Sequence, residues 1–258
     1  MLPRFAPTFR SEFFGFPTRT CRIRTHSDTT SGTYMSESNL PEWEQLLSAA
    51  AHLQEILPGA TLVGGTAVAI FAQHRLSQDA DHVLPDLRDR FDDVLANLEA
   101  VAGWRTARVK RPVLILGSLD GIETGVRQMI RDHPLETREV TIGGIRLTVP
   151  TEEELLRIKA VLILKRNATR DYLDFAALAE RIGAARVKNA LAEFDQFYPQ
   201  PNGESAFQQL EVQLGNPMPF DLENRDLKEY RQLHPKWHDW NAVKEFCGNV
   251  AVSLFKSV

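Results

Sequence analysis

The chain has 258 residues, of which 43% are hydrophobic and 25% charged, and its 30 Lys and Arg against 34 Asp and Glu give a net charge of −4. This composition is typical of a soluble globular protein and excludes a chain that is disordered throughout. No apolar stretch reaches the roughly 20 residues of a membrane-spanning helix, so we expect no membrane span. The two cysteines, Cys21 and Cys247, exclude a disulfide scaffold and a cysteine-built zinc site.

Residues 1–38 precede the predicted globular part. Up to Tyr34 this segment is rich in arginine, serine and threonine, and its acidic residues are Glu12 and Asp28. Such a composition is compatible with an organelle import signal, but a disordered tail or a reading frame that starts at Met35 explains it as well. We therefore exclude this segment from the predicted fold.

Residues 39–150 are predicted to contain both helices and strands. Apolar residues spaced by three and four between Trp43 and Leu57 predict a first helix, and a short β-prone run then meets the turn of Gly64 and Gly65. The later predicted elements are helices over 66–74 and 87–101, strands over 79–84 and 112–116, and a hairpin over 138–149 around Gly143 and Gly144.

Residues 151–258 are predicted to be helical. Thr151 and Glu154 form a capping-box pattern, in which each side chain bonds the backbone amide of the other residue. The predicted helices cover 152–165, 168–182, 184–197, 204–214, 222–232 and 239 to the end. We therefore expect an α+β protein with a mixed part over 39–150, a helical domain over 151–258 and a boundary near Pro150.

The pattern most indicative of chemistry is Gly64-Gly65 followed, after thirteen residues, by Asp79-Ala80-Asp81. Residues two apart in a strand point to the same face about 6.6 Å apart, so both carboxylates can hold divalent cations, which nucleotidyl transfer uses in pairs about 4 Å apart. Glycines let the backbone approach a polyphosphate, toward which the amides of the following helix point, and Thr66 adds a hydroxyl donor. The pattern predicts a metal and nucleotide site.

This arrangement resembles the DNA polymerase β-type nucleotidyltransferases, whose hallmark is a Gly-Gly or Gly-Ser turn followed by an Asp-x-Asp strand. More narrowly, the chain resembles the AbiEii/AbiGii toxin family over about residues 45–255. The stretches that carry this resemblance are 62–67, His74-Arg75-Leu76-Ser77, the helix around Lys159, Arg170-Asp171-Tyr172-Leu173-Asp174 and Trp237-His238-Asp239-Trp240. The resemblance implies a polymerase β-like core, a toxin of a toxin–antitoxin pair, and functional roles for Lys159 and Asp171.

Lys159 lies in a predicted helix with apolar residues nearly all round, so its ammonium group needs a partner. One partner is a carboxylate, Asp171 or Asp174. The other is a nucleotide phosphate, and the two can coexist.

The third metal-binding carboxylate is predicted to be Glu123, which lies in a β-prone segment after an apolar strand, with Asp120 as the second choice. Asp120-Gly121 also reads as a turn. Ala80 is small and His82 replaces an apolar residue of the family pattern, so an attenuated or inactive site stays open.

Further polar residues lie between or near these motifs. Arg75 is either a phosphate contact or part of an ion pair. Ser77 is expected to bond locally, with phosphorylation, which the resemblance implies, as the alternative. Residues 105–111 carry four cations, which form a solvated face or suit an RNA backbone.

We therefore expect a nucleotidyltransferase that moves a nucleoside monophosphate from an NTP to an acceptor. Asp79, Asp81 and Glu123 would hold Mg²⁺ or Mn²⁺, and Gly64, Gly65, Thr66, Arg75 and Lys159 would hold the triphosphate. The resemblance implies the 3′ end of tRNA as acceptor, an antitoxin partner and a cytoplasmic location. The alternatives are a protein hydroxyl as acceptor, a non-catalytic nucleotide- or RNA-binding relative, and a structural helical protein.

Overall fold

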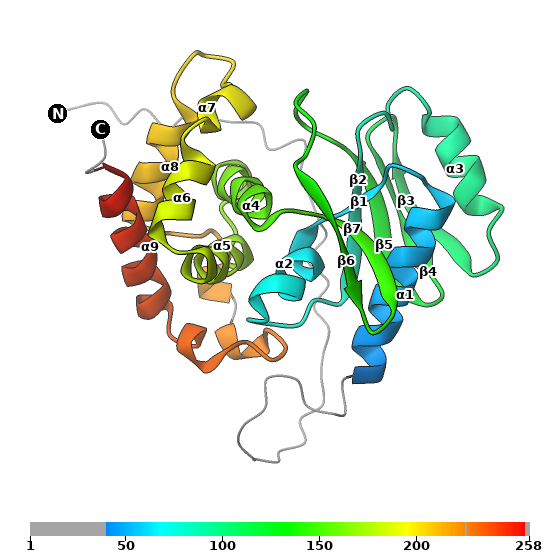
Figure 1. Ribbon diagram of the computed structural model, residues 1–258, viewed down its shortest axis with the longest axis horizontal. Helices are drawn as coiled ribbons and strands as arrows, with labels where there is room; N and C mark the ends of the chain where they lie inside the picture. The colour runs from blue at the N-terminus through cyan, green and yellow to red at the C-terminus, as the bar shows by residue number, and fades with distance from the viewer. Residues whose placement is uncertain (1–39, 225, 256–258) are drawn as a thin grey trace.

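The computed structural model of the protein describes residues 40–224 and 226–255 (Figure 1). The predicted extension over residues 1–38 lies outside this part of the chain. In chain order the elements up to the end of the second sheet are α1 (Leu40–Ile56), β1 (Thr61–Leu62), α2 (Gly64–Ala72), β2 (Asp79–Leu84), α3 (Phe91–Glu99), β3 (Trp104–Lys110), β4 (Leu114–Leu119), β5 (Ile122–Gln128), β6 (Thr137–Ile142) and β7 (Ile145–Pro150). The helices that follow are α4 (Glu152–Arg166), α5 (Thr169–Ile182), α6 (Ala184–Leu191), α7 (Phe194–Phe197), α8 (Ala206–Gly215) and α9 (Trp240–Phe255).

The larger sheet has five strands in the order β1-β2-β5-β4-β3. Strands β2 and β5 are parallel, and the other neighbours are antiparallel. Helices α1 and α3 cover one face of this sheet, where Leu53, Leu84, Val94, Ile115 and Val126 belong to one buried cluster (Figure 1). This confirms the predicted α+β class and its small mixed sheet.

The hairpin β6–β7 forms a second, two-stranded sheet, and its turn at Gly143 and Gly144 is the predicted one. The side-chain amide of Gln54 in α1 both donates to the backbone oxygen of Thr148 at 2.8 Å and accepts from its backbone nitrogen at 2.9 Å. This pair of hydrogen bonds fixes the hairpin against α1.

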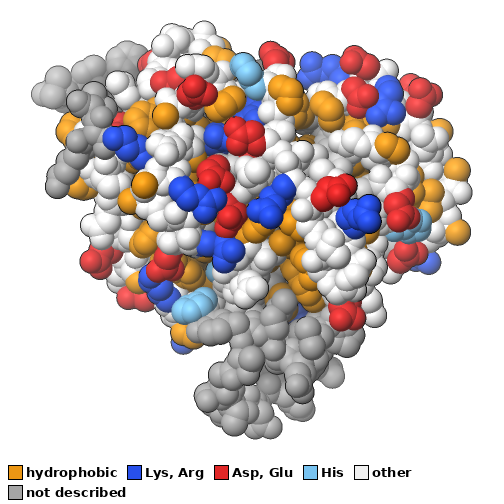
Figure 2. Space-filling view, in the orientation of Figure 1, with side chains coloured by type: hydrophobic (Ala, Val, Ile, Leu, Met, Phe, Trp, Pro, Cys, Tyr) orange, Lys and Arg blue, Asp and Glu red, His pale blue; other side chains and the backbone are white. Residues whose placement is uncertain are grey.

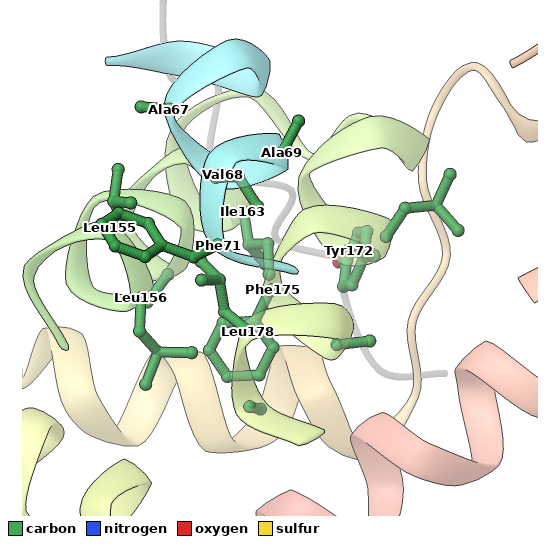
Figure 3. Packing of buried hydrophobic residues seen from close by; sticks show 14 of the residues in the cluster. Ala67, Val68, Ala69, Phe71, Leu155, Leu156, Ile163, Tyr172, Phe175 and Leu178 are labelled. Carbon is green, nitrogen blue, oxygen red and sulfur yellow. The ribbon is translucent and has the colours of Figure 1, made fainter. Parts of the chain in front are cut away.

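The helical part and the mixed part share one hydrophobic core. Helix α2 lies at their junction, and Figure 3 shows its Val68 and Phe71 beside Leu155 and Ile163 of α4 and Phe175 of α5. The same buried cluster extends to Trp43 in α1 and Cys247 in α9. The chain changes from mixed to helical structure near Pro150, but its core is continuous across that point.

Several predicted elements differ from the structure. Residues 104–110 form strand β3, where the sequence predicts only a basic run. Trp104 is the one buried residue of this strand, so its sequence lacks the alternation of apolar and polar residues that predicts a strand. The predicted helix over 184–197 divides into α6 and α7. The predicted helix over 222–232 is wrong: the segment contains 3₁₀ turns at Leu222–Asn224 and Leu227–Glu229.

Tertiary hydrogen bonds explain the last of these differences. The backbone nitrogen of Leu76 donates to the oxygen of Arg231 at 2.8 Å, and that of His234 donates to the oxygen of His74 at 2.7 Å. These bonds bind the C-terminal segment to the loop between α2 and β2, in place of the bonds of a continuous helix.

One of the two hydrogen bonds of the predicted capping box at Thr151 is present. Its hydroxyl accepts from the backbone nitrogen of Glu154 at 3.2 Å. The carboxylate of Glu154, however, is fully buried and binds Arg131 at 2.8 Å and Arg157 at 3.0 Å. Glu154 therefore connects α4 to the loop before β6 and does not complete a capping box.

His82 projects from β2 into the core on the α1 side of the sheet and is fully buried. Burial lowers its pKa to about 4. Because the pKa in the folded state is below the ordinary value, this group stabilises the fold above about pH 6.5 in its neutral form, and the stability falls as the pH drops toward 4.

We expect the free energy of unfolding to fall by about 2 kcal/mol between pH 7.5 and 5.0 through His82 alone. Urea unfolding of the wild type and of His82→Gln at both pH values measures this contribution. The substitution should reduce the difference between the two pH values by that amount, and an equal pH difference in both proteins would contradict the assignment to His82.

Candidate active site

The glycine turn lies between β1 and α2 and packs directly against the carboxylate strand. Gly64 has a φ of +76°, a left-handed conformation that favours glycine. A Cβ at Gly64 would lie 3.3 Å from the Cβ of Asp81, and one at Gly65 would lie 2.9 Å from the hydroxyl of Ser77. The missing side chains thus allow the first turn of α2 to approach β2 closely.

We expect Gly64→Ala to lower both stability and activity more than Gly144→Ala does. Both positions have a positive φ, but a Cβ at Gly144 meets no atom within 4 Å, so this control carries the backbone strain alone. The strain is about 1–3 kcal/mol in each case. Thermal unfolding and the rate of the nucleotidyl transfer that the sequence predicts measure the excess loss at Gly64, and equal losses in the two variants would show that the approach to Asp81 has no role.

Asp79 and Asp81 project from the same face of β2, as predicted. Both are half-buried, whereas Ala80 and His82 between and after them are buried on the opposite face. Burial raises the pKa of Asp81, and the negative charge of Asp79 raises it further. A carboxylate whose ionisation is opposed by a neighbouring carboxylate in this way gives a fitting site for a divalent cation.

The hydroxyl groups near Asp79 hold it in place. The hydroxyl of Ser77 donates to the Asp79 carboxylate at 2.7 Å. This hydrogen bond is local in the sequence, as predicted, and its acceptor is a side chain. The hydroxyl of Thr66 is fully buried and donates to the backbone oxygen of Asp79 at 2.5 Å. In this structure Thr66 therefore connects α2 to the start of β2 and is not exposed to a ligand.

Of the two choices for a third carboxylate, the structure places Glu123 nearer the pair. Glu123 is the β5 residue directly opposite Asp79, whereas Gly125 lies opposite Asp81. Asp120 lies in the turn between β4 and β5, where its carboxylate is 3.3 Å from His52. In the described part of the chain, no three His, Cys, Asp or Glu side chains gather closely enough to form a complete metal site by themselves.

The two aspartates nevertheless fit a magnesium ion. Magnesium is commonly held in proteins by one or two carboxylates together with the phosphates of a substrate and water. The chain supplies such a pair beside a glycine turn, so a third carboxylate is not required. A role for Glu123 as a third ligand stays a prediction.

Four arginines interact electrostatically with the aspartate pair. Arg127 of β5 has its Nε 3.9 Å from an Asp81 oxygen, and the other members are Arg75, Arg166 and Arg170. Burial lowers the pKa of Arg127, and the positive charges of Arg166 and Arg170 lower it further against the attraction of Asp81. Positive charges that repel one another in a partly buried site favour the binding of a polyanion.

Asp174 of α5 is the centre of a buried ion cluster beside this site. Its carboxylate lies 2.7 Å from the Nζ of Lys159, 2.7 Å from His74 and 2.7 Å from the Nε of Arg75. Burial alone would raise the pKa of Asp174, but Arg75 and Lys159 hold it well below its usual range. Arg75, which extends from Asp174 to the face of Gly65, thus forms an ion pair in this structure.

In this structure Lys159 has a carboxylate as its partner, that of Asp174. Only 2% of its side chain is exposed, and its Nζ also lies 3.7 Å from Asp171. Asp171 in turn receives two hydrogen bonds from the guanidinium of Arg166. In this structure Lys159 and Asp171 therefore contact other charged residues of the chain, and through Arg75 and Arg166 they adjoin the aspartate pair.

The sequence predicted Arg75 but missed Arg127, Arg166 and Arg170 as site residues. Arg127 could have been found from the strand pattern, because it lies two residues after Gly125 and so shares its face. Arg166 and Arg170 belong to different helices on either side of the α4–α5 turn, and only the tertiary fold brings them to β2. Figure 2 shows basic and acidic side chains interleaved across the middle of the molecule, between the helical part and the sheets.

None of the described helices is both long and apolar enough to span a lipid bilayer.

The chain is 34% identical over 129 residues to the heme uptake protein MmpL11 of Mycobacterium tuberculosis and 33% identical over 130 residues to the mycolic acid-containing lipids exporter MmpL11 of Mycolicibacterium smegmatis. Each match covers 49% of this chain and 13% of the other protein, so the chain spans only a small part of these relatives.

Solved structures with some likeness include the antibiotic-resistance factor ANT(2'')-Ia, with 16% identity and a TM-score of 0.45 over 64% of this chain and 95% of that one. Another is an antigenic nucleotidyltransferase-like protein from Paracoccidioides brasiliensis, with 17% identity and a TM-score of 0.42 over 66% of this chain and 93% of that one.

The family comparison covers most of the chain. Residues 45–249 match the family described as nucleotidyl transferase AbiEii toxin, type IV toxin–antitoxin system. This range begins within α1, ends within α9, and contains the glycine turn, the aspartate pair and the ion cluster of Asp174. The chain therefore belongs to the AbiEii toxin family of nucleotidyltransferases.

Proposed function

We propose that this nucleotidyltransferase is a metal-dependent toxin that transfers a nucleoside monophosphate from an NTP to the 3′ end of tRNA. The observation that carries the proposal is the contact between the glycine turn and the aspartate strand, where a Cβ at Gly64 would touch Asp81. A triphosphate at the first turn of α2 would thus lie beside the two carboxylates.

The positions of the residues support the following roles. Asp79 and Asp81 would hold one or two Mg²⁺ or Mn²⁺ ions with help from Glu123, and the backbone of Gly64 and Gly65 would bind phosphate. A bound ion would activate the attacking oxygen and neutralise charge on the leaving pyrophosphate.

The surrounding cations complete the site. Arg127, Arg166 and Arg170 interact electrostatically with Asp81, and they would orient the triphosphate. We assign positioning roles to Thr66, Lys159 and Asp171: Thr66 holds the start of β2, Lys159 fixes Arg75 through Asp174, and Asp171 fixes Arg166. Alignment and charge neutralisation are the main demands of this reaction on a protein.

Membership of the toxin family supports a toxin function and an antitoxin partner. A tRNA acceptor would place the reaction in the cytoplasm. The chemistry of the site does not distinguish a ribose hydroxyl from a protein hydroxyl, because either oxygen attacks the α-phosphorus in the same way.

The test uses the four α-³²P-labelled NTPs with deacylated total RNA and, separately, with RNase-treated lysate protein, in the presence of Mg²⁺ or Mn²⁺. We expect label in the tRNA band that RNase removes. Label in protein alone would replace tRNA by a protein acceptor. Label in neither fraction, from folded protein, would contradict the proposed transfer to both acceptor classes.

A further inference from the structure

We infer that Arg105, Arg108 and Lys110 of strand β3, here called the basic edge, bind the phosphate backbone of the nucleic-acid acceptor. The inference rests on the proposed function and adds the surface along which the acceptor approaches the aspartate pair. Its evidence is the register of the sheet, the exposure of the three side chains and their charge.

The strand register places the basic edge on the same face of the sheet as the aspartates. Asp79 is paired with Glu123, Glu123 with Ser118, and Ser118 with Arg105. Residues paired directly across neighbouring strands point to the same face. Arg105 therefore faces the same side as Asp79, three strand spacings or about 14 Å away.

A second row leads from the other aspartate to the basic edge. Asp81 is paired with Gly125, Gly125 with Leu116, and Leu116 with Arg108. Arg105 and Arg108 are three residues apart and would point to opposite faces of a regular strand. The register shift between Thr106 and Arg108, in which Ala107 is the extra residue, places both arginines on the aspartate side.

Lys110 extends the same face by one more row, because it is paired with Leu114, which is paired with Arg127 of the candidate active site. The helices α1 and α3 cover the opposite face, where Trp104, Ile115 and Val126 are buried. The aspartate face thus continues across β5 and β4 from the site to the basic edge.

Arg105 and Arg108 of the basic edge are open to a partner. Every residue of β3 except Trp104 is exposed, and β3 is an outer strand of the sheet. No ion pair joins Arg105 or Arg108 to any other residue in the part of the chain that the structure describes. The acidic residue on the rows between β3 and the aspartate pair is Glu123, next to Asp79.

A row of exposed cations in this position fits a phosphodiester chain. A nucleic acid presents regularly spaced negative charges, and cations that neutralise them release counterions, which supplies most of the binding free energy without base recognition. Such a strand would lie across β4 with its end at the carboxylates, about 14 Å from Arg105. Cations on outer strands also discourage pairing with other sheets, so the experiment has to separate binding from that structural role.

The test measures binding of fluorescently labelled deacylated tRNA, without NTP, over a range of salt concentrations. We expect Arg105→Gln with Arg108→Gln to weaken binding at least about tenfold and to reduce the slope of log K against log salt by about 1.4, since each single-strand phosphate contact contributes about 0.7. Arg105→Lys with Arg108→Lys should restore most of the slope, because it keeps both charges.

The matched control is Arg146→Gln with Lys188→Gln, which removes the same charge at exposed positions of β7 and α6. It should leave the slope unchanged. An equal loss in the control, unaltered tRNA binding by the β3 variant, a change in its oligomeric state alone, or no binding of tRNA by the wild type would each overturn the inference.

Steady-state kinetics of nucleotide transfer to tRNA distinguish a failure of this inference from a failure of the proposed function. If the wild type labels tRNA, the β3 variant should raise the KM for tRNA at least about tenfold with little change in kcat or in the KM for NTP. If the wild type labels tRNA and the variant does so with the same KM, the function stands and the basic edge has no part in it. If the wild type transfers no nucleotide but binds tRNA through β3, the proposed transfer to tRNA is wrong, and the inferred binding of tRNA by the basic edge is confirmed.

Discussion

Replacing Asp79 and Asp81 together by asparagine is expected to reduce nucleotidyl transfer by at least a factor of about 1,000 while the protein stays folded. The loss follows from removing both carboxylates that would hold the metal ions, since a single preorganised charge-stabilising group is worth about 10²–10³ in rate. The fold should not suffer, because the pKa of Asp81 is raised by burial and by Asp79. Ionising such a carboxylate costs folding free energy at neutral pH, and asparagine removes that cost.

The measurement combines the rate of label transfer with thermal unfolding. The melting temperature of the double variant should equal or exceed that of the wild type. Asp120→Asn is the matched control, because it removes an exposed carboxylate in the turn between β4 and β5, where it contacts His52 rather than the aspartate pair. Retention of transfer by the double variant, or an equal loss in the control, would remove the aspartates from the mechanism.

A toxin assay in a bacterial host gives the same comparison in cells. Growth arrest by the wild type but not by the double variant would connect the arrest to the aspartate pair. Equal growth inhibition by both proteins, at equal expression, would connect it to some other property of the chain.

The parts of the site that the sequence predicted depend on short-range patterns. The alternation of β2 places Asp79 and Asp81 on one face whatever the rest of the fold does, because the side-chain period of a strand is two. The glycine turn precedes a helix for equally local reasons. These two features lie close together because strand and helix are consecutive in the chain, so a motif of eighteen residues from Gly64 to Asp81 contains most of the prediction.

The parts that the sequence missed depend on tertiary contacts. Arg166 and Arg170 come to β2 only because α4 and α5 pack on α2 through a common core. The partner of Lys159 was left open between Asp171, Asp174 and a phosphate, since all three satisfy the same need for charge compensation. Strand β3 was missed for a different reason: its side chains are exposed on both faces, so it lacks the apolar alternation by which strands are recognised.

Asp174 connects the stability of the fold to the geometry of the site. Its carboxylate is completely buried and contacts Lys159 from α4 together with His74 and Arg75 from the loop between α2 and β2. The same Arg75 guanidinium lies against Gly65 and next to Ser77. The cluster therefore holds the helical part and the glycine turn in one arrangement, and damage to it should affect both properties.

We expect Asp174→Asn to lower the free energy of unfolding by about 3–5 kcal/mol, because it leaves Lys159 and Arg75 buried without their shared carboxylate. Lys159→Met should cost less, since Asp174 keeps Arg75 and His74 as partners. The pKa of Asp174 is held well below its usual range, so its contribution is complete above the ordinary aspartate pKa and is lost as the pH falls through the lowered value. Asp174→Asn should therefore also reduce the acid sensitivity of the fold below about pH 4.

Urea unfolding of these variants at pH 7.5 measures the predicted order. Lys236→Met is the control, because it breaks an ion pair with Glu180 in which both side chains are exposed, and such a pair contributes about 1 kcal/mol or less. If Asp174→Asn proves no more destabilising than Lys236→Met, the cluster does not hold the fold. If it destabilises as expected while Lys159→Met folds well but transfers nucleotide far more slowly, Lys159 serves the transfer through the ion cluster of Asp174 and Arg75, as its positioning role predicts.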